Sequence, residues 1–185
     1  MTAEHSIDMH IVPELPPAPG LRGLRPGLVL RSEDTYLVGR EKVREFARAI
    51  LAADPAHHDV DAAREAGYPD VVAPPTFSAV VTATLIRDML TGAESGIDMS
   101  THTPIHVNEK ITVAAPILAG DALTASLTVT AVTERGGAVF LDTETRLRTA
   151  AGEPRSTVMS SILLAPNEEA ALPEPVAVAV AVAAR

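Results

Sequence analysis

The stretch that decides the fold runs from residue 73 to residue 91 and reads APPTFSAVVTATLIRDMLT. Its two prolines, Pro74 and Pro75, suit the first turn of a helix, because proline lacks the N–H that a first turn leaves unpaired. Apolar side chains then recur at helical spacing, at Phe77, Val80, Val81, Leu85 and Met89. The other face holds mainly Ser and Thr until Arg87. We therefore predict a helix that is largely buried.

After this helix the apolar period changes from 3.6 residues to two, which is typical of strands. We predict strands over 105–113, 123–131, 139–147 and 157–164, with turns at 116–121, 135–137 and 151–154. In the first strand we expect one face to hold Ile105, Val107, Ile111 and Val113, and the other to hold His106, Asn108, Lys110 and Thr112. Helices followed by an antiparallel meander indicate an α+β domain with one sheet covered by one helix. Such a sheet leaves an edge exposed, so we expect association with a second chain.

Two further helices are predicted upstream. Residues 40–53 place apolar side chains on one face, at Val43, Phe46, Ala47, Ile50 and Leu51. A short helical turn over 61–66 has Asp59 as a candidate N-cap and ends at Gly67, a residue that readily adopts the backbone conformation of a helix end.

The chain of 185 residues fits one domain with a segment at either end. We predict an extended Pro-rich arm over 1–30, a single domain over 31–165 and an Ala/Val/Pro tail over 166–185. The tail contains alternating Val and Ala from Val176 to Val182. That pattern allows an extra edge strand, although its composition is more typical of a flexible segment.

Composition excludes several functions. The net charge of −9 disfavours nucleic-acid and membrane-surface binding, and the absence of cysteine excludes disulfides and thiolate metal sites. His102 and His106 have no carboxylate pattern beside them, so we expect neither a metal nor any other cofactor. No signal peptide or membrane-spanning run is found, which predicts a cytoplasmic protein. An acidic carrier protein would need a local basic patch, for which Arg146, Arg148 and Arg155 are candidates; ordinary solvated strand residues are the alternative.

Residues 49–77, with supporting matches over 38–46 and at Pro116-Ile117-Leu118-Ala119-Gly120-Asp121, resemble MaoC-like (R)-specific hydratases and dehydratases. Among these, the sequence especially resembles the non-catalytic-type subunits of mycolic-acid-pathway (3R)-hydroxyacyl-ACP dehydratase. The resemblance covers roughly residues 30 to 165. It implies a hotdog fold, in which an antiparallel sheet wraps a long central helix, and a homodimer or heterodimer that acts on acyl thioesters.

Active members of that family carry the motif Asp-x-Asn-Pro-x-His after their first helix, and its Asp and His act as general acid and base. In this sequence the Asn, Pro and His positions are Asp54, Pro55 and His57, while the Asp position is Ala52. An alanine cannot transfer a proton, so the dyad is incomplete. The glycine whose N–H stabilises the enolate-like oxygen aligns with Pro75 or Pro74, and proline has no N–H.

Each motif residue also has a structural interpretation. His57 without its acid fits a hydrogen-bonded loop histidine, whereas Asp54 lies close enough to Ala52 to replace the missing acid. His58 and Asp59 fit an exposed loop and a helix cap, and Asp121 fits a turn that it orders through backbone hydrogen bonds.

Three functional hypotheses follow from the resemblance. The leading one is a subunit of a (3R)-3-hydroxyacyl-thioester dehydratase, a hydro-lyase of fatty-acid or polyketide biosynthesis, that pairs with a catalytic hotdog chain and shapes the acyl tunnel. The tunnel and thioester candidates are Pro74, Pro75, Thr76, Phe77, Val80 and Val81, for which core packing is the alternative. The second is a self-sufficient homodimer that uses His57 and Asp54. The third is a non-catalytic protein that binds acyl thioesters. Acyl length and the carrier, ACP or CoA, stay open.

Overall fold

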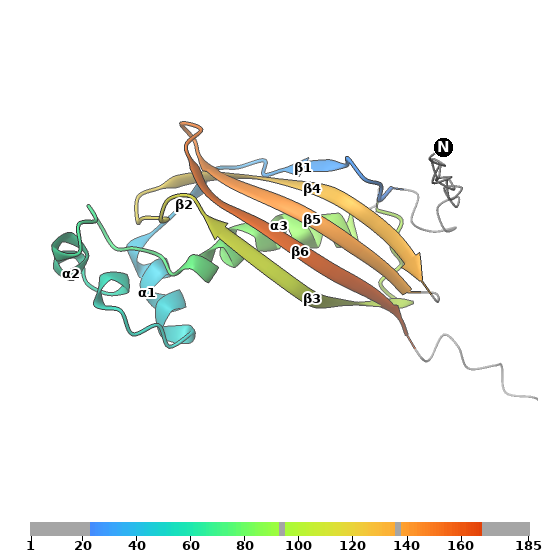
Figure 1. Cartoon of the computed structure of the whole chain (residues 1–185), viewed down its shortest axis with the longest axis horizontal. Coiled ribbons are helices and arrows are strands. Elements are labelled where there is room, and N and C mark those ends of the chain that lie inside the picture. Colours follow the sequence, from blue (N-terminus) through green and yellow to red (C-terminus); the bar gives the residue numbers. More distant parts are fainter. Residues whose placement is uncertain (1–22, 93–94, 136–137, 168–185) are drawn as a thin grey trace, which may run out of the picture.

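The computed structural model describes residues 23–92, 95–135 and 138–167. Long antiparallel strands form a sheet whose inner face lies along one long helix, α3, and the short helices α1 and α2 gather at one end (Figure 1). The elements are β1 (Val29–Arg31), β2 (Tyr36–Leu37), α1 (Arg40–Ala49), η1 (Pro55–His57), α2 (Val60–Glu65), η2 (Pro75–Phe77), α3 (Ser78–Thr91), β3 (His102–Val113), β4 (Ala122–Arg135), β5 (Ala138–Thr149) and β6 (Pro154–Pro166). This arrangement confirms the α+β class and the hotdog fold.

The sheet is not the simple meander that the sequence suggested. Its order is β1-β4-β5-β6-β3, and β2 also pairs with β4. The strand that comes first after α3 therefore pairs with β6 at the far edge and not with β4. The connection over 114–121 makes the crossing possible, because Ala73 N–H donates to Ile117 O and Ala119 N–H donates to Val71 O along its path. The strands β1 and β2 were not predicted, since each is too short to show a period.

The core lies between α3 and the inner face of the sheet. Phe77, Leu85 and Met89 are buried, as are alternate residues of the central strands, among them Leu127, Leu141, Leu147, Val158 and Leu164. Burial of a side chain of this size stabilises the fold by about 1.5–3 kcal/mol. The Phe77 ring also packs edge-on against Phe46 of α1 and Tyr36 of β2, which joins three elements at one end of the helix. The predicted helical stripe is thus confirmed.

The predicted alternation of β3 is wrong beyond Val107. His106 pairs with Ile162 and Asn108 with Ser161, so Val107 is an extra residue in a β-bulge. A bulge of one residue exchanges the two faces of a strand for everything that follows it. As a result His106 and Glu109 lie opposite Ile162 and Ser160, which are buried residues of β6 on the helix-facing side.

The first predicted helix ends earlier than its apolar stripe suggested. Helix α1 stops at Ala49, Ile50 is its C-cap, and Leu51 has a left-handed φ of 58°. The Ala52 N–H donates to Ala47 O, which closes the helix end. Ile50 and Leu51 therefore do not join the buried face, and 88% of Leu51 is exposed. In contrast, the Asp59 cap is confirmed, since its Oδ1 accepts from the N–H groups of Asp61 and Ala62.

Parts of the predicted arm and tail lie outside the described residues, including the Val176–Val182 repeat. The described part of the arm packs on the domain: Leu24 is buried and Gly27 N–H donates to Val129 O. The turn residues Gly136 and Gly137 are also outside, although Arg135 and Ala138 on either side of them pair. Among the described helices, none is both long and apolar enough to cross a membrane.

Candidate functional site

The loop that carries the motif residues is fixed by its own side chains. Nδ1 of His57 lies 2.8 Å from the carbonyl oxygen of Val72. A carbonyl oxygen only accepts, so Nδ1 carries the proton and the neutral ring keeps its lone pair on Nε2. The same contact holds the motif loop against the segment that leads to Pro74.

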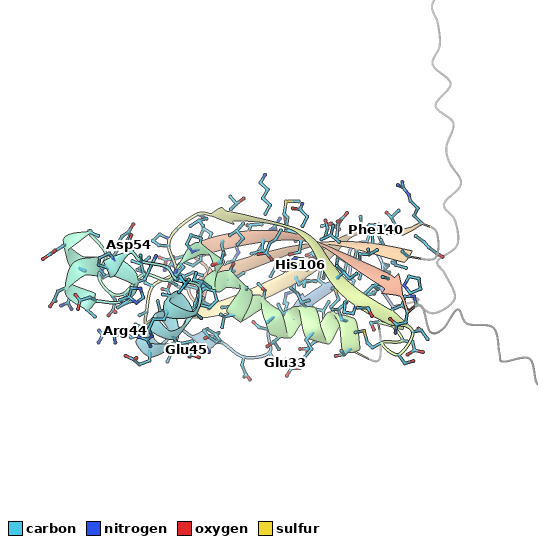
Figure 2. All side chains as sticks on the ribbon, turned by 90° about the horizontal axis from the view of Figure 1, so that it is seen from below. Glu33, Arg44, Glu45, Asp54, His106 and Phe140 are labelled. Atoms are coloured by element: carbon cyan, nitrogen blue, oxygen red, sulfur yellow. The ribbon has the colours of Figure 1, made fainter. Side chains whose placement is uncertain are left out.

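His58 is held through its other ring nitrogen, Nε2. Its Nε2 lies 2.7 Å from the carbonyl oxygen of Ala52, so Nε2 is the protonated nitrogen. Its own carbonyl accepts from Nε of Arg44 at 2.7 Å, which ties helix α1 to the loop. Figure 2 shows Arg44 and Asp54 together at the end of the molecule that holds the short helices. His58 is thus a structural loop residue, but it is half-buried and not exposed as the sequence suggested.

Asp54 already has a structural partner. Its Oδ1 accepts from the Ala56 N–H at 2.9 Å, which makes Asp54 the N-cap of the turn η1. The Ala52 side chain, at the position of the missing acid, is a methyl group. The Ala52 N–H donates to Ala47 O at the end of α1, and the Ala52 carbonyl accepts from the His58 ring. Among the described residues Nε2 of His57 has no hydrogen-bond partner, while Asp54, the suggested replacement for the missing acid, is used to cap η1.

The turn η2 contains the candidate thioester-binding residues. Pro74 is buried, whereas Pro75 and Thr76 are exposed. The first backbone hydrogen bond of this helical run is donated by Phe77 to Pro74 O, so the Thr76 N–H precedes the hydrogen-bonded ladder. It is the first N–H after two prolines that could meet a substrate oxygen.

The candidates for the acyl tunnel differ in their surroundings. Phe77 is fully buried in the aromatic cluster and Val80 is half-buried. Val81 lines a cavity of about 520 Å³ beside α3, together with Leu30, Leu85 and Leu123. The cavity also touches Glu33 and Asp34 of the segment between β1 and β2, and Figure 2 shows Glu33 next to the long helix. Its volume is in the range of small-molecule sites.

Two ion pairs hold the surroundings of the motif loop. The Asp70 carboxylate accepts from Nη2 of Arg40 at 2.6 Å and from Nε of Arg40 at 2.9 Å. This hydrogen bonding lowers the pKa of the Asp70 carboxyl. Asp121 accepts from Nε and Nη2 of Arg155 at 2.8 and 2.9 Å and from the Leu118 N–H at 3.0 Å. Burial raises the pKa of the Asp121 carboxyl, but these hydrogen bonds outweigh burial and hold it below its usual range.

The suggestion that Arg155 belongs to a basic surface patch is therefore wrong, because only 12% of its side chain is exposed and Asp121 neutralises its charge. Arg146 pairs with Glu144, and Arg148 donates to Gly152 O. The turn-ordering role of Asp121 is confirmed, while its pairing with Arg155 had no signal in the sequence, since 34 positions separate the two residues. Among the described residues no group of three His, Asp or Glu side chains is arranged to hold a metal ion.

Comparison with known proteins agrees with this geometry. The chain belongs to the FAS1-like dehydratase domain family, whose model matches residues 26–158. It is 44% identical over 138 residues to a UPF0336 protein of Clavibacter michiganensis subsp. michiganensis, which is 75% of this chain and 91% of that protein. The resemblance to hotdog dehydratases stated from the motif is thus confirmed.

Two solved structures extend the comparison. One is the C-terminally truncated HadBC (3R-hydroxyacyl-ACP dehydratase) complex of Mycobacterium tuberculosis, with 30% identity and a TM-score of 0.66; the match covers 75% of this chain and 96% of that one. The other is a MaoC-like dehydratase, with 31% identity and a TM-score of 0.70, where the match covers 78% of this chain and 43% of that one. The first of these two structures, HadBC, is a complex.

Proposed function

We propose that this chain is the non-catalytic subunit of a (3R)-3-hydroxyacyl-thioester dehydratase. In this proposal it pairs with a second hotdog chain that supplies a complete Asp/His dyad, and the complex eliminates water to give a trans-2-enoyl thioester. The observation that carries the proposal is Ala52, which puts a methyl group where a proton-transferring carboxylate is needed. Similarity to a subunit of the HadBC complex supports it.

The surface for the partner is proposed to be the free edge of β3. This strand pairs with β6 on one side, no described strand pairs with its other side, and it carries three exposed apolar residues, Ile105, Val107 and Val113. An edge strand of this kind is a template for pairing with another chain. Pairing there would cover the apolar side chains.

The acyl chain is proposed to lie against Val81, Leu85 and Leu123 in the cavity beside α3. The thioester would then lie nearer to Thr76 at the start of the same helical run, whose N–H is the first available donor after Pro75. An apolar floor suits an acyl chain, because burying methylene groups is favourable by about 0.8 kcal/mol each. ACP or CoA as carrier, the biosynthetic pathway and the cytoplasmic location stay predictions.

The test is to purify the chain alone and together with a hotdog chain of the source organism that contains the intact Asp-x-Asn-Pro-x-His motif. We expect no dehydration of a 3-hydroxyacyl thioester by the chain alone and turnover by the complex. Turnover should be lost when the partner's motif histidine is replaced. Dehydration by the chain alone at an ordinary enzymatic rate would contradict the proposal.

A self-sufficient homodimer is the second candidate, and it is favoured by Nε2 of His57, which has no hydrogen-bond partner among the residues that the structure describes. Against it, Asp54 is committed to capping Ala56. Loss of lone-chain turnover in His57→Asn would select this candidate. Tight binding of an acyl thioester with neither turnover nor a partner would select the binding-protein hypothesis.

A further inference from the structure

The bulge at Val107 turns two titratable side chains toward the long helix. His106 and Glu109 both lie on the helix-facing side of β3, with Nε2 of His106 3.6 Å from Oε2 of Glu109. The Ser160 hydroxyl of β6 lies 3.5 Å from the same carboxylate oxygen. Figure 2 shows His106 near the middle of the molecule, far from Asp54 at the end that holds the short helices. The pair is therefore separate from the motif loop.

Glu109 lines an apolar groove. The groove has a volume of about 460 Å³ and lies between β3 and α3, where Ala79, Ala83, Ile86, Leu90 and Met99 form most of its wall. Only 27% of the Glu109 side chain is exposed. Because the groove borders the free edge strand, a chain that covers the exposed apolar residues of β3 would also reduce the access of water to this carboxylate.

The charge of the groove is unbalanced. Among the described residues the charged side chains that line it are Glu109 and Arg87. Arg87 donates to its neighbour Asp88 at 3.3 Å, so its charge is already matched. His106 faces Glu109, but its Nε2 lies 3.6 Å from Oε2, which is beyond hydrogen-bond distance, and His106 does not line the groove. Glu109 is thus the carboxylate that a covering chain must neutralise.

We propose that this groove accepts a partner that brings a cationic side chain to Glu109, and that the same carboxylate opposes pairing between two copies of this chain. A desolvated carboxylate without a counter-charge is costly, whereas one that meets a cation is not. If two copies paired over this groove, each would desolvate its own Glu109 carboxylate, and each chain carries a net charge of −9. The choice of partner therefore rests on the proposed function, while the opposition to self-pairing does not.

The first experiment measures self-association of the full chain by sedimentation equilibrium at pH 7. Glu109→Gln should self-associate roughly tenfold or more tightly than the wild type, the change expected when an unpaired charge is removed from an interface. Glu65→Gln is the matched control, because it makes the same change in net charge at an exposed position of α2. Glu109→Ala must behave like Glu109→Gln, and circular dichroism verifies that each variant is folded.

The second experiment measures the affinity for the motif-bearing hotdog chain described above. Glu109→Gln should weaken this complex roughly tenfold or more, and Glu65→Gln should leave it unchanged. Equal behaviour of Glu109→Gln and Glu65→Gln in either experiment overturns the inference. A complex that shows this dependence on Glu109 but does not dehydrate the thioester contradicts the proposed function alone. An active complex that is insensitive to Glu109 contradicts this inference alone.

Discussion

The imidazole of His57 is bound through Nδ1 to the carbonyl oxygen of Val72 at 2.8 Å, which links the motif loop to the segment before η2. The contact anchors the loop whether or not the ring takes part in chemistry. The two roles can be separated, because an asparagine side chain can donate to a carbonyl oxygen but cannot act as a base at neutral pH.

We therefore predict that His57→Asn changes turnover by the two-chain complex less than threefold, since loss of a working general base costs about 10²–10⁴-fold. His57→Ala should lower the free energy of unfolding of this chain by about 1–2 kcal/mol, because it leaves the Val72 carbonyl without its partner. Steady-state kinetics and urea unfolding measure the two effects. A drop in turnover of a hundredfold in His57→Asn, with the complex intact, would show that this histidine acts in catalysis.

The Asp121–Arg155 pair should make the chain sensitive to acid. Both side chains are only 12% exposed, so Asp121→Ala should destabilise the chain by about 3 kcal/mol at neutral pH. The folded pKa of Asp121 is lower than its unfolded value, so its contribution is complete above the unfolded pKa of ~3.9 and is lost as the pH falls through the folded pKa. The difference in unfolding free energy between the wild type and Asp121→Asn should therefore shrink below about pH 4. A difference that stays constant between pH 3 and pH 7 would contradict this account.

The local elements of this fold follow from the sequence, and its long-range contacts do not. The period of Phe77, Leu85 and Met89 is sufficient to predict the long helix, because a buried helix face repeats within a few residues. The Asp121–Arg155 pair and the position of β3 beside β6 depend on the path of the connection over 114–121, which no local pattern records. The sheet order could therefore not be predicted from alternation alone.

The motif loop could be predicted in part. The incomplete dyad is visible in the sequence, since Ala52 and His57 are read directly from the motif. The hydrogen bonds of Asp54 and His58 are not visible there, because each depends on backbone atoms positioned by the end of α1. The sequence placed the end of α1 too late. An apolar stripe favours continuing the helix through Ile50 and Leu51, whereas the backbone at Leu51 is left-handed.

Leu51 should be a site of backbone strain. A left-handed conformation costs an L-residue with a side chain about 1–2 kcal/mol, and 88% of Leu51 is exposed, so its side chain regains little by packing. Leu51→Gly should therefore raise the free energy of unfolding by about 1 kcal/mol. Ala49→Gly, two residues earlier and within α1, should lower it by a similar amount, because glycine disfavours helix. Equal destabilisation by both substitutions, measured by urea unfolding, would argue against strain at Leu51.

A buried hydroxyl provides a further test of the core. Among the described residues, Ser156 Oγ is buried without a hydrogen-bond partner. A polar group buried in this way is unfavourable, so Ser156→Ala should leave the chain as stable as the wild type or more stable by up to about 1 kcal/mol. Ser156→Val adds volume to a packed interior and should destabilise it. Thermal unfolding of the two variants measures both effects, and a clear loss of stability in Ser156→Ala would indicate an unseen partner for this hydroxyl.

The free edge of β3 should matter for assembly and not for the stability of the single chain. Ile105 and Val107 are exposed, so Ile105→Lys and Val107→Lys should each change the free energy of unfolding by less than about 0.5 kcal/mol. Each lysine would have to be buried or displaced when a partner covers the edge, which should weaken the two-chain complex roughly tenfold. Leu37→Lys is the matched control, because Leu37 is also exposed but lies on β2, which pairs with β4 away from this edge. Titration calorimetry of the complex distinguishes the two positions: if Leu37→Lys weakens it and the β3 substitutions do not, the partner binds at the opposite side of the sheet.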